Sequence, residues 1–305
     1  LGGATAIAAP SWVSYAAQRR LVGQQPIMVP PAIGQGGVPQ PDLLHAAVVD
    51  AREQGRTVNA VVVTLPDNPT GTVAAVETVR RLAEVARELD LVIISDELYR
   101  DLVHPAGEGE TQVEVHSPAE FAPERTVIST GLSKNLALGG WRLGVLRLPD
   151  SEIGHRLRGG LLGVASEIWS SPAAPVQEAA AHAFTEPVEL RDHIDRSRRL
   201  HGLVARGVGH VFTEAGAAVE TPRAAFYLYP DFAPVREQLA SSHGITTGPE
   251  LTALLLDRFG TGVLPAVEFG ESPGALRMRV ATSLLYGHTD EQRNTALSAT
   301  DPLAL

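Results

Sequence analysis

The sequence contains no cysteine, which excludes disulfides, thiolate metal sites and cysteine nucleophiles. It has no apolar run that approaches the ~20 residues needed to span a bilayer. Basic residues are also scarce: 25 against 35 acidic ones, for a net charge of -10. This balance argues against a non-specific nucleic-acid surface, which needs a basic patch. The sequence therefore predicts a soluble cytoplasmic protein, with neither nucleic acid nor membrane as a partner.

Two catalytic signatures are missing as well. The ten histidines form no metal-ligand spacing, so no metal site is expected. None of the serines near the candidate motifs lies in a Gly-x-Ser-x-Gly turn, which removes support for serine-hydrolase chemistry. These serines are Ser11, Ser14, Ser129 and Ser133.

The chain has 305 residues, 44% of them hydrophobic, enough for one large α/β domain or two unequal ones. Helical patterns alternate with short apolar strands up to Pro149, which is typical of a mainly parallel sheet. The expected strands are residues 5–9, 26–29, 59–64, 91–95, 126–130 and 145–148. The expected helices between them are residues 15–21, 42–54 and 72–89, the last with Thr72 as its N-cap.

Helices dominate residues 151–212, and a smaller α+β layer closes the chain. Its predicted strands are residues 224–229, 262–264 and 275–282, and its predicted helices are 189–211, 250–259 and one from 290. We place the boundary near Pro187. The expected division is a large domain over residues 1–187 and a small C-terminal domain over 188–305.

Three polar residues follow the ends of predicted strands: Asn68, Asp96 and Lys134. In open α/β sheets, ligands bind at the carboxyl ends of the strands. The pattern therefore places these side chains at one candidate site. Lys134 lies among small and apolar residues, which makes a plain surface lysine a poor interpretation.

Several segments, in order and approximate spacing, resemble class I/II aminotransferases. They are DNPTG at residues 67–71, SDELY at 95–99, LSK at 132–134 and GWRLG at 140–144, with PSWVSY at 10–15 and LRMRVA at 276–281. Each motif alone is weak, but six in the family's order form a specific signal. The resemblance implies a pyridoxal-phosphate (PLP) enzyme of fold type I. That fold has a large domain with a seven-stranded, mainly parallel sheet flanked by helices, and a smaller α+β domain.

The resemblance also implies roles around the cofactor ring. Lys134 would form a Schiff base with PLP and later move a proton at the substrate Cα. Asp96 would face the pyridine nitrogen, Asn68 and Tyr99 would hydrogen-bond the ring's phenolic oxygen, and Trp12 would stack on the ring. Plainer roles also fit the sequence: a helix N-cap for Asp96, a turn for Asn68, and core aromatics for Tyr99 and Trp12. A cis Asn68–Pro69 bond is implied too.

Anion contacts follow from the same resemblance. Arg142 would bind the cofactor phosphate, with Ser133 as a second donor. Arg277 matches the arginine that holds the substrate α-carboxylate. Arg279 stands where relatives often have a small polar residue. It would add a second anion contact that favours acidic substrates, or form an ion pair with a nearby carboxylate.

The family carries a segment before the position of Leu1, including a glycine-rich turn whose helix binds the phosphate. We expect that part of the fold to be absent from this chain. The predicted function is transfer of an amino group between an amino acid and a 2-oxo acid, by a homodimer. Two alternatives are a PLP enzyme for elimination, replacement or ring formation, and an aminotransferase-like domain of a transcription regulator.

Overall fold

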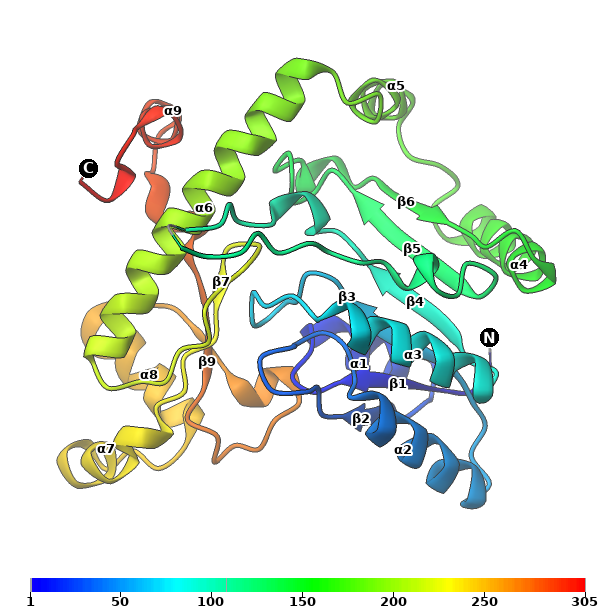
Figure 1. The fold of residues 1–305 in the computed structure, drawn as a ribbon, viewed down its shortest axis with the longest axis horizontal. Coiled ribbons are helices and arrows are strands. Elements are labelled where there is room, and N and C mark those ends of the chain that lie inside the picture. The colour runs from blue at the N-terminus through cyan, green and yellow to red at the C-terminus, as the bar shows by residue number, and fades with distance from the viewer. Residues whose placement is uncertain (1, 108, 305) are drawn as a thin grey trace.

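The computed structural model describes residues 2–107 and 109–304 and has a central six-stranded sheet (Figure 1). The strand order is β2-β1-β3-β4-β5-β6, with the first five strands parallel and β6 antiparallel to β5. The strands are β1 (Ala4–Ala8), β2 (Ile27–Val29), β3 (Val58–Thr64), β4 (Val92–Asp96), β5 (Thr126–Gly131) and β6 (Gly144–Arg147). Each matches a predicted strand within two residues. The family resemblance implies a seven-stranded sheet, whereas the sheet has six strands in the described part of the chain.

Helices cover both faces of this sheet. On one face, α2 (Pro41–Glu53) and α3 (Val76–Glu88) pack on apolar residues of β1 to β4. On the other face lie α1 (Val13–Leu21) and α4 (Glu152–Ile168). Strand β3, one of the two central strands, buries every residue but one, as its run of β-branched residues predicts. These layers confirm the expected α/β class with a mainly parallel sheet.

A predicted helix start was wrong. Helix α3 begins at Val76 with Ala75 as its N-cap, not at Thr72. The Thr72 hydroxyl instead accepts a hydrogen bond from the Gly36 amide at 2.9 Å and lies 2.7 Å from the Thr70 hydroxyl. Thr72 therefore closes the turn after β3, so its side chain does not cap the helix.

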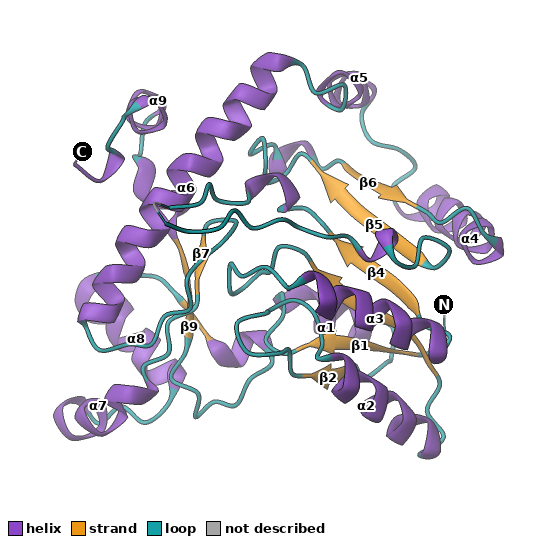
Figure 2. Cartoon of the chain, in the orientation of Figure 1, coloured by secondary structure: helices purple, strands orange, loops and turns teal. Residues whose placement is uncertain are grey.

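The second half of the chain is mostly helical and contains a small antiparallel sheet (Figure 2). That sheet has the order β7-β9-β8. The strands are β7 (Tyr227–Leu228), β8 (Leu264–Pro265) and β9 (Met278–Ala281), and the helices are α5 (Ala174–Ala183), α6 (Val188–Glu214), α7 (Arg236–His243), α8 (Gly248–Phe259) and α9 (Asp290–Ser298). The long α6 runs from α5 down to the part of the molecule that holds this sheet (Figure 1).

The predicted strand over residues 224–229 is reduced to the two residues of β7. The backbone interrupts it at Ala225, which has a φ of 58°. Ala224 lies outside β7 and forms an isolated bridge to Val103. None of the helices in the described residues is both long and apolar enough to cross a bilayer.

Candidate functional site

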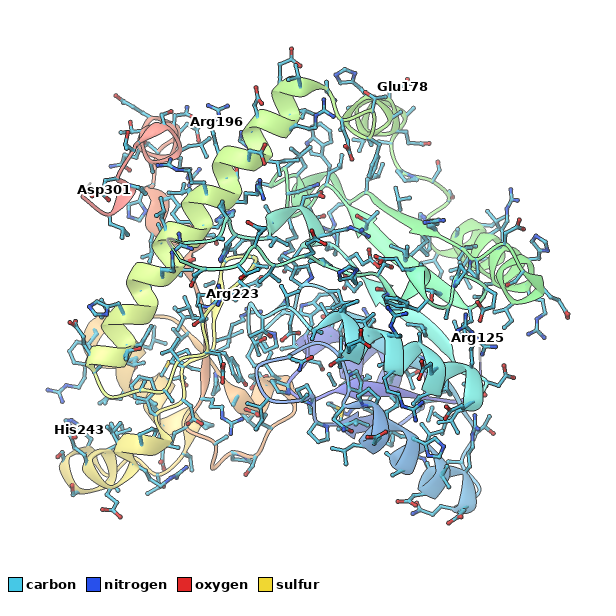
Figure 3. All side chains as sticks on the ribbon, in the orientation of Figure 1. Arg125, Glu178, Arg196, Arg223, His243 and Asp301 are labelled. Carbon is cyan, nitrogen blue, oxygen red and sulfur yellow. The ribbon has the colours of Figure 1, made fainter. Side chains whose placement is uncertain are left out.

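The carboxyl ends of three parallel strands meet at one edge of the central sheet. Asp96 ends β4, and its register partners are Thr64 at the end of β3 and Ser129 in β5. The loops that follow these strands carry Asn68, Tyr99 and Lys134, so the predicted convergence at this edge is present in the fold. Figure 3 shows side chains in the space between these loops and α6.

The Asp96 carboxylate lies in a network of hydroxyl and amide donors. Its Oδ2 accepts a hydrogen bond from the Tyr15 hydroxyl at 2.5 Å, and its Oδ1 accepts one from the Leu98 amide at 3.3 Å. The Tyr15 hydroxyl also lies 3.1 Å from Thr64 Oγ1. Burial raises the pKa of Asp96 above its ordinary value, while the Tyr15 hydrogen bond and the Lys134 charge act in the opposite direction. The Asp96 carboxylate is thus fixed in orientation by hydrogen bonds from Tyr15 and Leu98, and it does not cap a helix.

Lys134 is half-buried in the loop after β5. Its Nζ lies 5.7 Å from the centroid of the Tyr99 ring. Burial and the positive charge of Arg279 lower the pKa of Lys134, and the Asp96 carboxylate partly offsets this. Lys134 is also the only lysine in the sequence. The site thus contains the chain's one side-chain amine, under conditions that favour its neutral, nucleophilic form.

Asn68 and Tyr99 are both buried and are joined to Arg279 and Tyr227. The Arg279 Nη1 donates to Asn68 Oδ1 at 3.1 Å, and Asn68 Nδ2 donates to the Tyr99 hydroxyl at 3.5 Å. The hydroxyls of Tyr99 and Tyr227 lie 3.0 Å apart. Burial raises the pKa of Tyr99, so its hydroxyl keeps its proton. We call Asn68, Asp96 and Tyr99 the strand-end group.

A glycine brings the second half of the chain to this group. Gly71 has a φ of 71°, and its carbonyl accepts hydrogen bonds from the amides of Arg223 and Ala224. A Cβ at Gly71 would lie 2.5 Å from the Tyr227 carbonyl oxygen. Only glycine allows this approach, which brings the Tyr227 backbone against the loop that carries Asn68.

The two arginines of the predicted carboxylate site have different surroundings. The Arg277 side chain forms ion pairs with Asp231 at 2.9 Å and with Glu271 at 2.5 Å. No carboxylate forms an ion pair with Arg279 within the described ranges. Its guanidinium lies 4.9 Å from the Tyr227 ring centroid and 5.1 Å from that of Phe269. The ion pairs considered for Arg279 are therefore found at Arg277.

The predicted phosphate contacts, Ser133 and Arg142, lie in the loop between β5 and β6, and we call them the loop group. Ser133 is half-buried and Arg142 is exposed. Arg142 has a φ of 54°, and its Nη1 donates to the Gly139 carbonyl, three residues earlier, at 2.7 Å. The structure does not bring Arg142 into contact with the strand-end group.

Trp12 lies directly before α1 and packs edge-to-face against Tyr15, with ring centroids 5.2 Å apart. Its ring is half-buried beside the sheet.

The implied cis Asn68–Pro69 bond was wrong. Within residues 2–107 and 109–304, the cis bonds are Ala9–Pro10 and Leu65–Pro66.

Sequence reasoning missed Tyr15 and Tyr227. A signal for Tyr15 was present, because it follows Trp12 by three residues at the start of a helix, and residues three apart share a helix face. Tyr227 had no such signal, because its contacts with Tyr99 and Arg279 join residues far apart in the sequence.

Known proteins with similar sequences belong to the family that the motifs resemble. The family model for aminotransferase class I and II matches residues 2–299. The aspartate aminotransferase of Bacillus subtilis is 29% identical over 280 residues, which cover 91% of this chain and 65% of the relative. A probable aspartate/prephenate aminotransferase of Thermus aquaticus is 30% identical over 280 residues, covering 90% of this chain and 64% of the relative. The chain thus spans slightly less than two thirds of the length of these curated relatives.

Solved structures show the same relationship. A tetra mutant of Thermus thermophilus aspartate aminotransferase has a TM-score of 0.75 and 27% identity, covering 97% of this chain and 72% of that one. The same organism's enzyme with maleate has a TM-score of 0.75 and 26% identity, covering 97% and 68%. The chain therefore belongs to the aminotransferase class I and II family.

Proposed function

We propose that the protein is a PLP-dependent aminotransferase that moves an amino group between an amino acid and a 2-oxo acid. The observation that carries this proposal is the position of Lys134. The only lysine of the chain lies half-buried beside Tyr99, close enough to Asp96 for their charges to interact. Aminotransferases of this family use pyridoxal phosphate.

The residues present match the chemical groups of this cofactor. Lys134 supplies an amine for its aldehyde, and Asp96 supplies a carboxylate for its pyridinium nitrogen. The Asn68 amide and the Tyr99 hydroxyl supply neutral hydrogen-bonding groups for its ring oxygen, and Trp12 supplies an aromatic face. When bound, PLP provides an electron sink for negative charge at the substrate Cα.

The chain's own residues then have defined tasks. Asp96 holds a proton on the pyridine nitrogen by its negative charge, and Tyr15 fixes the direction of that carboxylate. Lys134 Nζ accepts and returns the proton at the substrate Cα, a task that its lowered pKa favours.

We assign the substrate carboxylate to Arg279, not to Arg277. The Arg277 guanidinium already binds two carboxylates, so a third anion would have to compete with Asp231 and Glu271. Within the residues that the structure describes, the Arg279 guanidinium forms one hydrogen bond, to Asn68, which leaves it further donors for an anion. The relatives' names and the maleate in one Thermus structure favour acidic substrates as the first to test.

Incubation of the purified protein with PLP, aspartate and 2-oxoglutarate tests this function. Formation of glutamate and oxaloacetate in equal amounts is the expected result. Release of ammonia without a new amino acid would instead indicate elimination, replacement or ring-forming chemistry. Three further predictions stay proposals. The two-domain division at residue 187/188 rests on the sequence pattern, the cytoplasmic location rests on composition, and the homodimer rests on the family resemblance. Light scattering of the purified protein tests the dimer.

A further inference from the structure

Two buried tyrosines meet in the site through their hydroxyl groups. The Oη atoms of Tyr99 and Tyr227 lie 3.0 Å apart, and both side chains are at most 5% exposed. Tyr99 lies in the loop after β4, and Tyr227 is in β7, in the second half of the chain. The pair therefore joins the strand-end group to β7, which pairs with β9, the strand that carries Arg279.

The direction of the neighbouring hydrogen bonds can be worked out from Arg279. A guanidinium only donates, so the Asn68 atom that faces Arg279 must be the amide oxygen. The other end of the same amide, Nδ2, then faces Tyr99 and donates to its hydroxyl oxygen. Arg279 thus fixes the orientation of Asn68, and Asn68 occupies one acceptor position of Tyr99.

A count of protons shows that the tyrosine pair has one donor to spare. The two hydroxyls carry two protons, and only one of these lies in the hydrogen bond between them. If Tyr227 donates to the second acceptor position of Tyr99, the Tyr99 proton stays free. A buried donor without an acceptor is costly, so this arrangement favours a ligand that brings an acceptor atom.

Tyr227 contacts Arg279 as well, through its ring. The guanidinium carbon lies 4.9 Å from the ring centroid, within the range of a cation–π interaction. Tyr227 also pairs with Ala281, two residues after Arg279 on β9. The close approach at Gly71 fixes the backbone of Tyr227 beside the Asn68 loop. One side chain therefore contacts both Tyr99 and Arg279.

We propose that Tyr227 is a positioning residue with two separable functions. Its hydroxyl donates to Tyr99 and leaves the Tyr99 proton free for the ring oxygen of the cofactor, and its aromatic ring holds Arg279 in place for the substrate carboxylate. The inference rests on the proposed function, because it assigns Tyr227 a task toward the same cofactor and substrate.

Two variants separate these functions. Tyr227→Phe removes the hydroxyl and keeps the ring, whereas Tyr227→Leu removes both. Tyr286→Phe is the matched control, because it removes a half-buried tyrosine hydroxyl that binds His201 outside the site. The measurements on PLP-loaded protein are the pH midpoint of the visible absorbance band, and kcat and KM for aspartate.

Tyr227→Phe is expected to move the midpoint to higher pH by about half a unit or more, because the Tyr99 hydroxyl then supports the anionic ring oxygen less well. Its KM stays close to that of the wild type. Tyr227→Leu is expected to show the same shift and to raise KM by roughly three- to tenfold. Tyr286→Phe changes neither quantity.

An unchanged midpoint in Tyr227→Phe overturns the role of the hydroxyl, and an unchanged KM in Tyr227→Leu overturns that of the ring. If Tyr227→Leu does not fold, Tyr227→Met replaces it, since Met fills irregular space without an aromatic face. A double-mutant cycle of Tyr99→Phe and Tyr227→Phe, read by thermal unfolding of the PLP-free protein, tests the contact itself. Additive effects in that cycle overturn the hydrogen bond whether or not the protein binds PLP. A wild type that forms no visible band overturns the proposed function, and with it the cofactor role of Tyr227.

Discussion

The strand-end group and the loop group lie in the same proposed cofactor site, but they are held very differently. Asn68 and Tyr99 are buried, and Asp96 is fixed by the Tyr15 hydroxyl. Arg142 is exposed and donates to a carbonyl of its own loop. The parallel strands thus hold the proposed contacts to the cofactor ring in place, whereas the Arg142 side chain, a proposed phosphate contact, is held only by its own loop in the described residues. Preorganisation of this kind determines how much a side chain contributes to catalysis.

Removal of Lys134, which lies in the loop after β5 and contacts the Tyr99 ring, should have the largest effect. Lys134→Ala eliminates the single side-chain amine, so the visible band should disappear and kcat should fall by ~10⁴-fold or more. Borohydride reduction followed by mass spectrometry checks this directly. In the wild type one side chain gains the cofactor mass, and the peptide around residue 134 carries it. A covalent adduct elsewhere in the wild type would refute the assignment.

Asp96→Asn tests the strand-end group and should rank second. The amide keeps the size of the side chain but loses the negative charge that would hold a proton on the pyridine nitrogen of the proposed cofactor. We expect kcat to fall by roughly 10²- to 10³-fold, within the range for a lost acid–base interaction. Tyr15→Phe is the companion variant, because it leaves the charge and removes only the hydrogen bond that orients it. An equal loss in both variants would show that orientation matters as much as charge.

Much of the strand-end group could be predicted from the sequence, and the physical reason is the sheet. Strand periodicity places the end of each strand within about two residues, and parallel strands bring those ends to one edge. Asp96 and Asn68 follow from this directly. The hydrogen-bond partner of each side chain does not follow from the strand pattern, because Tyr15 reaches Asp96 across the space between a helix and a strand.

The two arginines show where sequence reasoning reaches its limit. Arg277 and Arg279 are two residues apart, so strand geometry gives both the same face and cannot rank them. The difference arises from Asp231 and Glu271, which approach Arg277 from other parts of the chain. Similarly, the φ of Ala225 that shortens β7 and the turn that engages Thr72 depend on tertiary contacts.

Arg279→Ala should have the third largest effect and extends the comparison to the substrate. Loss of a charge-assisted contact is expected to lower kcat/KM for aspartate by roughly 10- to 100-fold, mainly through KM. Arg277→Ala should lower kcat/KM less and the unfolding temperature more, because it leaves two carboxylates without their partner. Steady-state kinetics and thermal unfolding of both variants test which arginine binds the substrate carboxylate. A larger loss of kcat/KM in Arg277→Ala would restore the assignment that the sequence resemblance suggests.

Arg142→Ala should have the smallest effect if the loop group is as weakly held as its surroundings indicate. The side chain is exposed, so its removal should change thermal unfolding of the PLP-free protein very little. We expect the dissociation constant for PLP to rise by roughly tenfold, since a charge-assisted phosphate contact is lost, while kcat at saturating PLP stays near that of the wild type. Arg147→Ala, an exposed arginine on β6, is the matched control and should leave PLP affinity unchanged. Titration of the visible band with PLP measures both variants. Arg142→Ala could instead lose as much kcat as Asp96→Asn does. That result would mean that the loop becomes ordered around the phosphate and contributes to catalysis as strongly as the strand ends do.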